Sequence, residues 1–136
     1  MYVNDLILRL QMSGYGCSIG LQFIGCVMYA DDLILLSPSV TALQKMVDIC
    51  VNEIASLDLM FNVQKCSILR FGSRYMRACA PIMVGSEEIK YASTAKYLGV
   101  MLCSGKCFSM DVHYAKSNFI PVSIQYSTKG PSFTMN

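Results

Sequence analysis

Two adjacent aspartates between two short apolar runs constrain this chain more than any other feature of its sequence. Residues 29–32, Tyr-Ala-Asp-Asp, follow the apolar run 21–28 and precede the apolar run 33–36. Short apolar runs separated by a brief polar segment predict two strands joined by a tight turn, a β-hairpin with the aspartates at its tip. Carboxylates there cannot be hidden without a large desolvation cost, so we expect them to face water, a cation or a basic partner.

Paired carboxylates at such a tip have two explanations. Mg²⁺ and Mn²⁺ prefer oxygen ligands of this kind, and a nucleoside triphosphate would bring further oxygens. Alternatively, Asp31 and Asp32 are ordinary turn residues, because aspartate tolerates turn conformations and bonds to nearby backbone.

A helix is predicted over residues 41–57, because apolar residues recur there at steps of three and four and form one stripe. The spacing of Thr41 and Gln44 is that of a capping box at the start of this helix. We expect the helix to pack on the back of the hairpin sheet through its stripe, which consists of Leu43, Met46, Val47, Cys50, Ile54 and Leu57.

The remaining pattern predicts a short helix and a series of strands. Residues 2–12 have a helix-like period that ends at Ser13 and Gly14. Within the hairpin, the strands are expected over residues 19–28 and 33–37. Later strands are expected over residues 59–63, 67–71, 81–84, 88–91 and 96–102. Residues 111–119 are expected to begin a helix that Pro121 ends, with residues 122–128 alternating like a strand.

Several segments together resemble a known family. Residues 29–32 look like the YxDD hairpin of reverse transcriptases, and the alanine in second position resembles the non-LTR (LINE-type) retrotransposon branch. Residues 2–6 are similar to the segment after the template-contacting helix of that family. Residues 61–66 resemble the next motif, which ends in an asparagine and a lysine, and residues 96–100 are similar to the strand near the primer grip. Order and spacing agree over residues 2–102.

The resemblance implies an α+β fold, namely a partial polymerase palm whose antiparallel sheet carries the YADD hairpin and is backed by one long helix. Residues 1–102 would form this partial palm. Residues 103–136 would be a tail that begins a thumb-like segment. The implied parent activity is metal-dependent, RNA-directed DNA synthesis by nucleotidyl transfer.

The resemblance also implies a metal site. Asp31 would be a direct ligand of Mg²⁺ or Mn²⁺, and Asp32 a second ligand or a support for the first. Lys65 matches a family lysine that donates a proton to the departing pyrophosphate or steers it. The plainer alternative for Lys65 is a solvated lysine at a strand edge.

Four further residues are implied to lie near nucleic acid. Tyr29 would contact the primer terminus, and Gly99 would let the nucleic-acid backbone come close. The plainer alternative for Tyr29 is an aromatic in the hairpin core, and that for Gly99 is a glycine that relieves a bend. The expected partners are an RNA template, a DNA primer and a dNTP, and the implied contact residues are Tyr29, Tyr97, Leu98 and Gly99.

Other family motifs would lie upstream of Met1. These are an aspartate on an earlier strand and a helix containing glutamine and glycine, and Asp5 stands in the wrong segment to replace that aspartate. We therefore expect the C-terminal part of a palm, with the missing N-terminal half as a partner. The alternative is a non-enzymatic retrotransposon remnant that at most binds nucleic acid or protein.

Charge and cysteine content bound the remaining possibilities. Residues 1–61 hold two basic and six acidic side chains, whereas residues 62–136 hold nine basic and three acidic ones. An acidic end for cations and a basic end for phosphates suits a polymerase. The seven cysteines lack a CxxC pair and an export signal, which favours reduced thiols and an intracellular protein. Cys103, Cys107 and His113 lack a fourth ligand and the usual spacing for zinc.

A membrane-spanning helix is the remaining alternative. Residues 10–30 carry no charge and have about the length that a bilayer requires. Four glycines, two glutamines and two serines interrupt this segment, and it runs directly into the two aspartates. Strands are therefore the better interpretation, and we expect no contact with a membrane.

Overall fold

The main sheet joins strands from both ends of the chain. The computed structural model describes residues 2–29, 32–98, 100–107, 109–110 and 120–128. The sheet has the order β3-β4-β12-β5, with β6 also paired to β12, and every pairing is antiparallel. Its strands are β3 (Cys26–Tyr29), β4 (Asp32–Ser37), β5 (Leu59–Phe61), β6 (Ser67–Ile68) and β12 (Ile120–Thr128).

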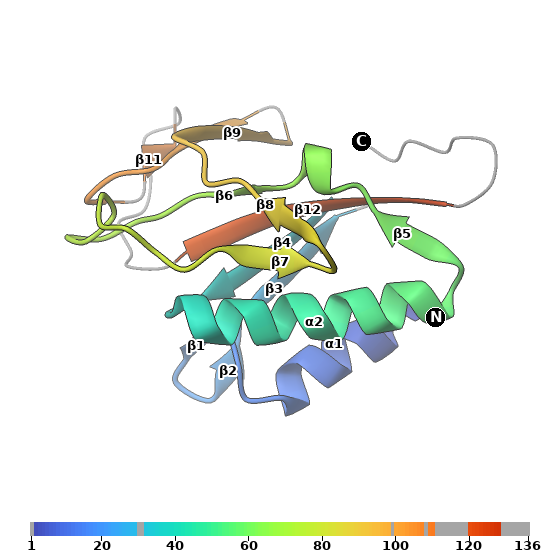
Figure 1. The fold of residues 1–136 in the computed structure, drawn as a ribbon. Coiled ribbons are helices and arrows are strands. Elements are labelled where there is room, and N and C mark those ends of the chain that lie inside the picture. Colours follow the sequence, from blue (N-terminus) through green and yellow to red (C-terminus); the bar gives the residue numbers. More distant parts are fainter. Residues whose placement is uncertain (1, 30–31, 99, 108, 111–119, 129–136) are drawn as a thin grey trace.

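Two helices cover one face of this sheet, α1 (Tyr2–Met12) and α2 (Val40–Ser56) (Figure 1). The predicted stripe of α2 is buried at Leu43, Met46, Val47, Cys50 and Ile54. The first four of these residues share one core with Leu33 and Leu35 of β4. Leu57 is the C-terminal cap of the helix. The predicted α+β class is confirmed, because apolar periodicity places one face of each element in a shared core.

The predicted capping box at the start of α2 is wrong. The N-cap is Ser39, whose backbone is extended and whose hydroxyl accepts a hydrogen bond from the Ala42 N–H at 3.2 Å. Serine supplies this acceptor directly, so Thr41 lies inside the first turn. Gln44 instead reaches another element: its amide nitrogen donates to the Met83 carbonyl at 2.9 Å, and its amide oxygen accepts from the Met83 N–H at 2.8 Å.

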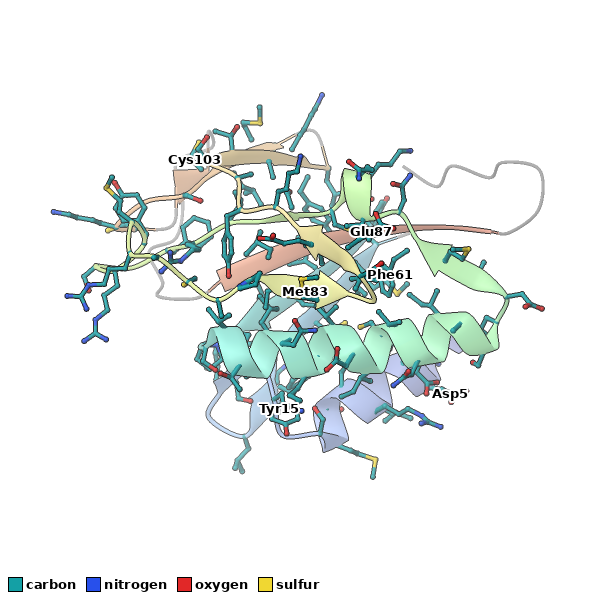
Figure 2. The ribbon with its side chains drawn as sticks, in the orientation of Figure 1. Asp5, Tyr15, Phe61, Met83, Glu87 and Cys103 are labelled. Carbon is teal, nitrogen blue, oxygen red and sulfur yellow. The ribbon has the colours of Figure 1, made fainter. Side chains whose placement is uncertain are left out.

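A separate hairpin lies along α2. It consists of β7 (Ile82–Val84) and β8 (Glu87–Ile89), with Ile82 opposite Ile89 and both side chains fully buried. Figure 2 shows Met83 on the strand next to the helix, where Gln44 holds its backbone. This hairpin agrees with the strands predicted around residues 85–86.

A third layer lies on the side of the main sheet away from the helices (Figure 1). It contains β9 (Thr94–Tyr97), β10 (Val100–Cys103) and β11 (Ser109–Met110) in the order β11-β10-β9. The single strand predicted over residues 96–102 is wrong, because the chain turns after Tyr97 and pairs it with Val100. The backbone of Leu98 lies in the left-handed region (φ 49°). The alternation of apolar and polar residues in the sequence does not indicate this turn.

The strand predicted over residues 19–28 is also wrong as one element. The segment forms β1 (Ser18–Ile19), β2 (Gln22–Phe23) and then β3, with a turn at Gly20. A Cβ at Gly25 would lie 2.6 Å from the Phe23 ring, so only glycine fits between β2 and β3. The strand predicted over residues 59–63 ends at Phe61 and continues into η1 (Val63–Lys65), a 3₁₀ turn.

The strand predicted over residues 122–128 is confirmed as β12, and its position is central. Residues 120–125 pair with β4, and residues 122–123 and 126–128 pair with β6 and β5 on the other side. Pro121 lies inside this strand, at a position where the described partner is Leu36 alone. Proline has no backbone N–H to donate, and it is tolerated there because this residue has a described strand partner on one side only. The helix predicted over residues 111–119 lies outside the described residues.

Within the described part of the chain, no helix combines the length and apolar character that a membrane crossing requires. The uncharged segment 10–30 contains the end of α1 followed by β1, β2 and β3.

Candidate catalytic and nucleic-acid site

The pairing of β3 with β4 places the predicted site residues. Tyr29 stands opposite Asp32, and Val27 stands opposite Ile34. Residues 30–31 join the two strands and lie outside the described residues, so Asp31 has no described position. Asp32 is the member of the carboxylate pair whose position is described.

Asp32 is buried rather than displayed to solvent. Asp32 is only 8% exposed, and it is the first residue of β4. Side chains alternate between the faces of a strand, and Leu33 and Leu35 belong to the core beneath the helices. Asp32 therefore lies on the opposite face, toward the layer of β9 and β10. Of the three surroundings expected for this carboxylate, open water is wrong, because Asp32 belongs to the strand ladder rather than to the tip of the turn.

Tyr29 has the opposite environment on the same face. Tyr29 is 62% exposed, although its backbone pairs directly with that of Asp32. Directly opposite residues of an antiparallel pair share a face of the sheet. An open aromatic side chain therefore lies beside a buried carboxylate.

Tyr97 approaches this site from β9. Its hydroxyl oxygen is buried and has no hydrogen-bond partner among the described residues. Burial contributes most to raising the pKa of Tyr97. The negative charge of Asp32 raises this pKa further, and the charge of the Cys26 thiolate has a smaller effect in the same direction. The structure thus brings Tyr97 close to Asp32, a proximity that no local sequence signal indicates.

The other predicted residues lie elsewhere or outside the description. Leu98 is 52% exposed at the turn between β9 and β10, and Gly99 lies outside the described residues. Lys65 is exposed at the end of η1, on the connection between β5 and β6. The structure therefore groups Tyr29, Asp32 and Tyr97, with Lys65 on a separate element.

A basic loop follows β6. The Arg70 guanidinium donates to the backbone carbonyls of Arg74, at 2.8 Å, and of Arg77, and it lies 5.8 Å from the centre of the Tyr91 ring. Arg70 thus organises the loop, whereas Arg74 and Arg77 are exposed. A surface hollow of about 340 Å³ lies between this loop and Ser39 at the start of α2. No local pattern in the sequence distinguishes Arg70, with this structural role, from Arg74 and Arg77.

The described residues contain no group of three or more histidine, cysteine, aspartate or glutamate side chains arranged to hold a metal ion. The donor chemistry of Asp32 nevertheless suits a hard cation such as Mg²⁺, because carboxylate oxygens are its usual protein ligands.

Comparison with known proteins identifies the family of this chain. The model of the reverse transcriptase (RNA-dependent DNA polymerase) family matches residues 3–102, and the chain belongs to that family. No curated protein and no solved structure matches the chain. The match covers β3, β4 and β9, so Tyr29, Asp32 and Tyr97 all lie within the family domain.

Proposed function

We propose that this chain is the C-terminal part of the palm of a non-LTR retrotransposon reverse transcriptase, with nucleotidyl transfer as its parent activity. The observation that carries the proposal is the pairing of Tyr29 with the buried Asp32 inside the segment that matches the family. A carboxylate in a region of low dielectric attracts a cation more strongly than one in water, which favours this position for catalysis.

Asp31 and Asp32 would hold Mg²⁺ or Mn²⁺. When bound, the ion supplies activation of a primer hydroxyl and stabilisation of the charge on the leaving group. Asp32 would contribute oxygen ligands from a fixed strand position, and Asp31 would contribute from the adjoining turn. Lys65 would donate a proton to the departing pyrophosphate or steer it, as an ammonium group can.

Nucleic acid would approach the face that carries Tyr29. Its exposed ring offers a surface for contact with the end of a primer, and aromatic rings stack well on bases. Leu98 and Gly99 at the turn after β9 would lie along the same nucleic acid. The implied substrates are an RNA template, a DNA primer and a dNTP.

A polypeptide partner is part of this proposal. Large apolar side chains are exposed on α1 and on the β1–β2 hairpin, at Met12, Ile19 and Leu21. Large apolar side chains that are exposed in a folded chain suit a protein interface when they form a patch. The N-terminal part of the palm, which the family resemblance places before this segment, is the partner that we propose for this surface, and it would bring the further aspartate of the catalytic site.

A second candidate function is a retrotransposon remnant that binds nucleic acid without catalysis. The favouring observation is the exposed pair Arg74 and Arg77 on a loop that Arg70 holds in place. Phosphate contacts from such arginines give affinity that is independent of sequence and falls with salt. This activity would not depend on Asp31 or Asp32.

Primer extension tests the first candidate against the second. The chain, alone and mixed with the upstream palm segment of a non-LTR reverse transcriptase, is incubated with an RNA template, a DNA primer, dNTPs and Mg²⁺. We expect Asp32→Asn to reduce extension at least about 100-fold, because carboxylate charge at the reacting centre is removed. The matched control is Asp5→Asn, a carboxylate that Figure 2 shows on α1, within the helix layer.

Binding of the same RNA–DNA duplex is measured in parallel by fluorescence anisotropy. Extension that survives Asp32→Asn, or that never occurs even with the upstream segment, contradicts the enzymatic proposal. If no extension occurs, duplex binding that persists in Asp32→Asn and is lost in the double variant Arg74→Ala, Arg77→Ala would support the second candidate instead.

A further inference from the structure

The loop that follows β6 concentrates positive charge. Residues 70–80 contain three arginines and no acidic residue, and we name residues 70–79 the arginine loop. Arg70 holds this loop through its hydrogen bonds to the carbonyls of Arg74 and Arg77. The guanidinium groups of Arg74 and Arg77 make no ion pair or hydrogen bond with the residues that the structure describes. Two cations are therefore available on one short surface loop.

Backbone hydrogen bonds fix the base of the arginine loop. The Gly72 N–H donates to the Gly105 carbonyl at 3.0 Å, and the Gly105 N–H donates to the Arg70 carbonyl at 3.1 Å. Within the loop, the Tyr75 N–H donates to the Gly72 carbonyl at 3.2 Å. A loop that is already ordered loses less conformational freedom when it binds a ligand, so this loop is preorganised for binding.

Two hollows flank the arginine loop. The hollow of about 340 Å³ described above lies on the side of α2, and a second hollow of about 230 Å³ lies on the side of Tyr91. Arg70 and Tyr75 line both hollows, so Tyr75 stands at the border between them. Met76, Tyr91 and Ser104 complete much of the second hollow. This hollow therefore combines aromatic and apolar walls with a basic rim.

The side chains of Tyr75 and Met76 have no role in either hydrophobic core. Tyr75 is half-buried and is hydrogen-bonded through its backbone alone among the described residues, while Met76 is 82% exposed. Tyr91 differs, because its hydroxyl donates to the Ala80 carbonyl at 2.8 Å and its ring faces the Arg70 guanidinium. The ring of Tyr75 is therefore the aromatic group of this hollow that stays available to a ligand.

The chemistry of the arginine loop selects its ligand. Guanidinium groups match the geometry of phosphate, and aromatic rings stack on the faces of bases. In a duplex those faces are covered by neighbouring bases, whereas a base of a single strand can turn outward onto an aromatic side chain. An acidic peptide would satisfy the arginines but would make no use of an aromatic hollow. The match to the RNA-dependent DNA polymerase family also favours nucleic acid.

We propose that the arginine loop binds a single-stranded segment of nucleic acid. Its phosphates lie on Arg74 and Arg77, and one unstacked base lies against Tyr75 in the second hollow. This inference rests on the nucleic-acid binding proposed above, to which it adds a base site and a preference for single strands.

The arginine loop is separate from the carboxylate site. The first hollow adjoins Pro38 and Ser39, which follow the last residue of β4, whereas Asp32 is the first residue of that strand. The length of β4 between these ends is about 17 Å at the usual rise per residue. In Figure 1 the loop projects between β6 and β7 at the edge of the molecule. Binding there is consequently independent of Asp32.

The proposal is tested by fluorescence anisotropy on the full chain. The probes are a labelled DNA strand of about 12 nucleotides, which suits a small binding surface, the RNA strand of the same sequence, their duplexes, and the DNA strand with its central bases removed. We expect the intact single strands to bind about tenfold more tightly than a duplex or the abasic strand, because one base is stacked. A difference between RNA and DNA identifies the source of the strand, and either source supports the proposal.

Substitutions at Tyr75 test the base site. Tyr75→Ala should lower the affinity for single strands to that for the duplex and leave the duplex affinity unchanged, which also shows that the loop has kept its fold. Tyr75→Phe retains the ring and should retain the preference. Tyr15→Ala is the matched control, because this exposed tyrosine lies near the helices, away from the arginine loop (Figure 2).

Substitutions of the arginines test the phosphate contacts. Replacing Arg74 and Arg77 together with alanine should weaken binding to every probe and reduce the slope of log affinity against log salt by about two, one for each phosphate contact. Lys45→Ala removes an exposed charge on α2 and should leave the slope unchanged. Asp32→Asn should leave single-strand binding unchanged, and a loss there would overturn the separate site.

Three results overturn the proposal while nucleic-acid binding stands. These are equal affinity for single strands and duplexes, a preference that persists in Tyr75→Ala, and competition by a polyglutamate peptide as effective as that by the unlabelled strand. The last result would mean that charge alone is recognised. A chain that binds no oligonucleotide contradicts the proposed nucleic-acid binding and this inference together. Primer extension is scored separately, so its absence beside single-strand binding refutes only the enzymatic proposal.

Discussion

The two tyrosines that precede the β3–β4 and β9–β10 turns, Tyr29 and Tyr97, have opposite environments. Between β3 and β4, Tyr29 is exposed and its neighbour across the ladder, Asp32, is buried. Between β9 and β10, the hydroxyl of Tyr97 is buried and the following Leu98 is exposed. Polarity along the chain would suggest the reverse for Asp32 and Leu98. The comparison shows that burial at these turns depends on the layer that lies over each face.

The largest expected effect on stability distinguishes a core residue beside the first turn from an exposed residue in the second turn. Leu33→Ala removes a fully buried side chain from the core beneath α2 and should lower the free energy of unfolding by about 2–5 kcal/mol. Leu98→Ala, at the exposed turn, should change it by less than about 0.5 kcal/mol. Urea unfolding followed by circular dichroism measures both, and equal losses would contradict the layered core.

A smaller effect is expected where the β7–β8 hairpin is tied to α2. Gln44→Ala would leave the Met83 N–H and carbonyl without the two hydrogen bonds that Gln44 provides, which costs about 1–3 kcal/mol. Thr41→Ala is the matched control on the same helix, because Ser39 provides the cap. Urea titration of the two variants checks this, and a larger loss for Thr41→Ala would restore the capping box.

The turn after Tyr97 should become more stable when its strain is removed. Leu98 has a φ of 49°, and this conformation costs a side chain about 1–2 kcal/mol that glycine does not incur. Leu98→Gly should therefore raise the thermal midpoint, offset in part by the greater freedom of glycine in the unfolded chain. Gly20→Ala, with a φ of +59° and open space around its Cα, should lower the midpoint. Calorimetry that gave both changes the same sign would contradict this conformation.

The smallest effect concerns pH and appears only in alkaline solution. Burial raises the pKa of the Cys26 thiol from 9.0 to about 11. The folded state therefore holds this proton more tightly than the unfolded state, so the contribution is complete below pH 9 and is lost as pH rises toward 11. Cys26→Ala should flatten the fall of the urea midpoint over this interval, compared with Cys107→Ala at an exposed position. An identical slope in both variants would rule out Cys26 as the source.

Local periodicity was enough to predict part of this fold. The stripe on α2 was correct because each of its buried residues contributes to one face at a spacing of three or four. The cap was missed because Ser39 and Thr41 have similar propensity for that position. The turn at Leu98 was missed because leucine rarely adopts a positive φ. The hydrogen bonds from Gln44 to Met83 join distant segments, and no local pattern records them.

The candidate site shows the same limit. The motif around residues 29–32 indicated the family, and the family match agrees. The burial of Asp32 and its proximity to Tyr97 depend on how β9 lies over β4. Such proximity arises from tertiary packing, so the sequence named the residues but did not reveal that they meet.

The position of β12 has a consequence for how the protein is made. Ser37 pairs with Ile120 and Asp32 pairs with Gln125, so the ladder beside the aspartate closes only after most of the chain has left the ribosome. Before then, β4 presents an unpaired edge, and such edges recruit other chains. Pairings between distant segments also form slowly. β5 and β6 also pair with β12, so chaperones that shield nascent chains would act on these three strands in the interval before β12 arrives.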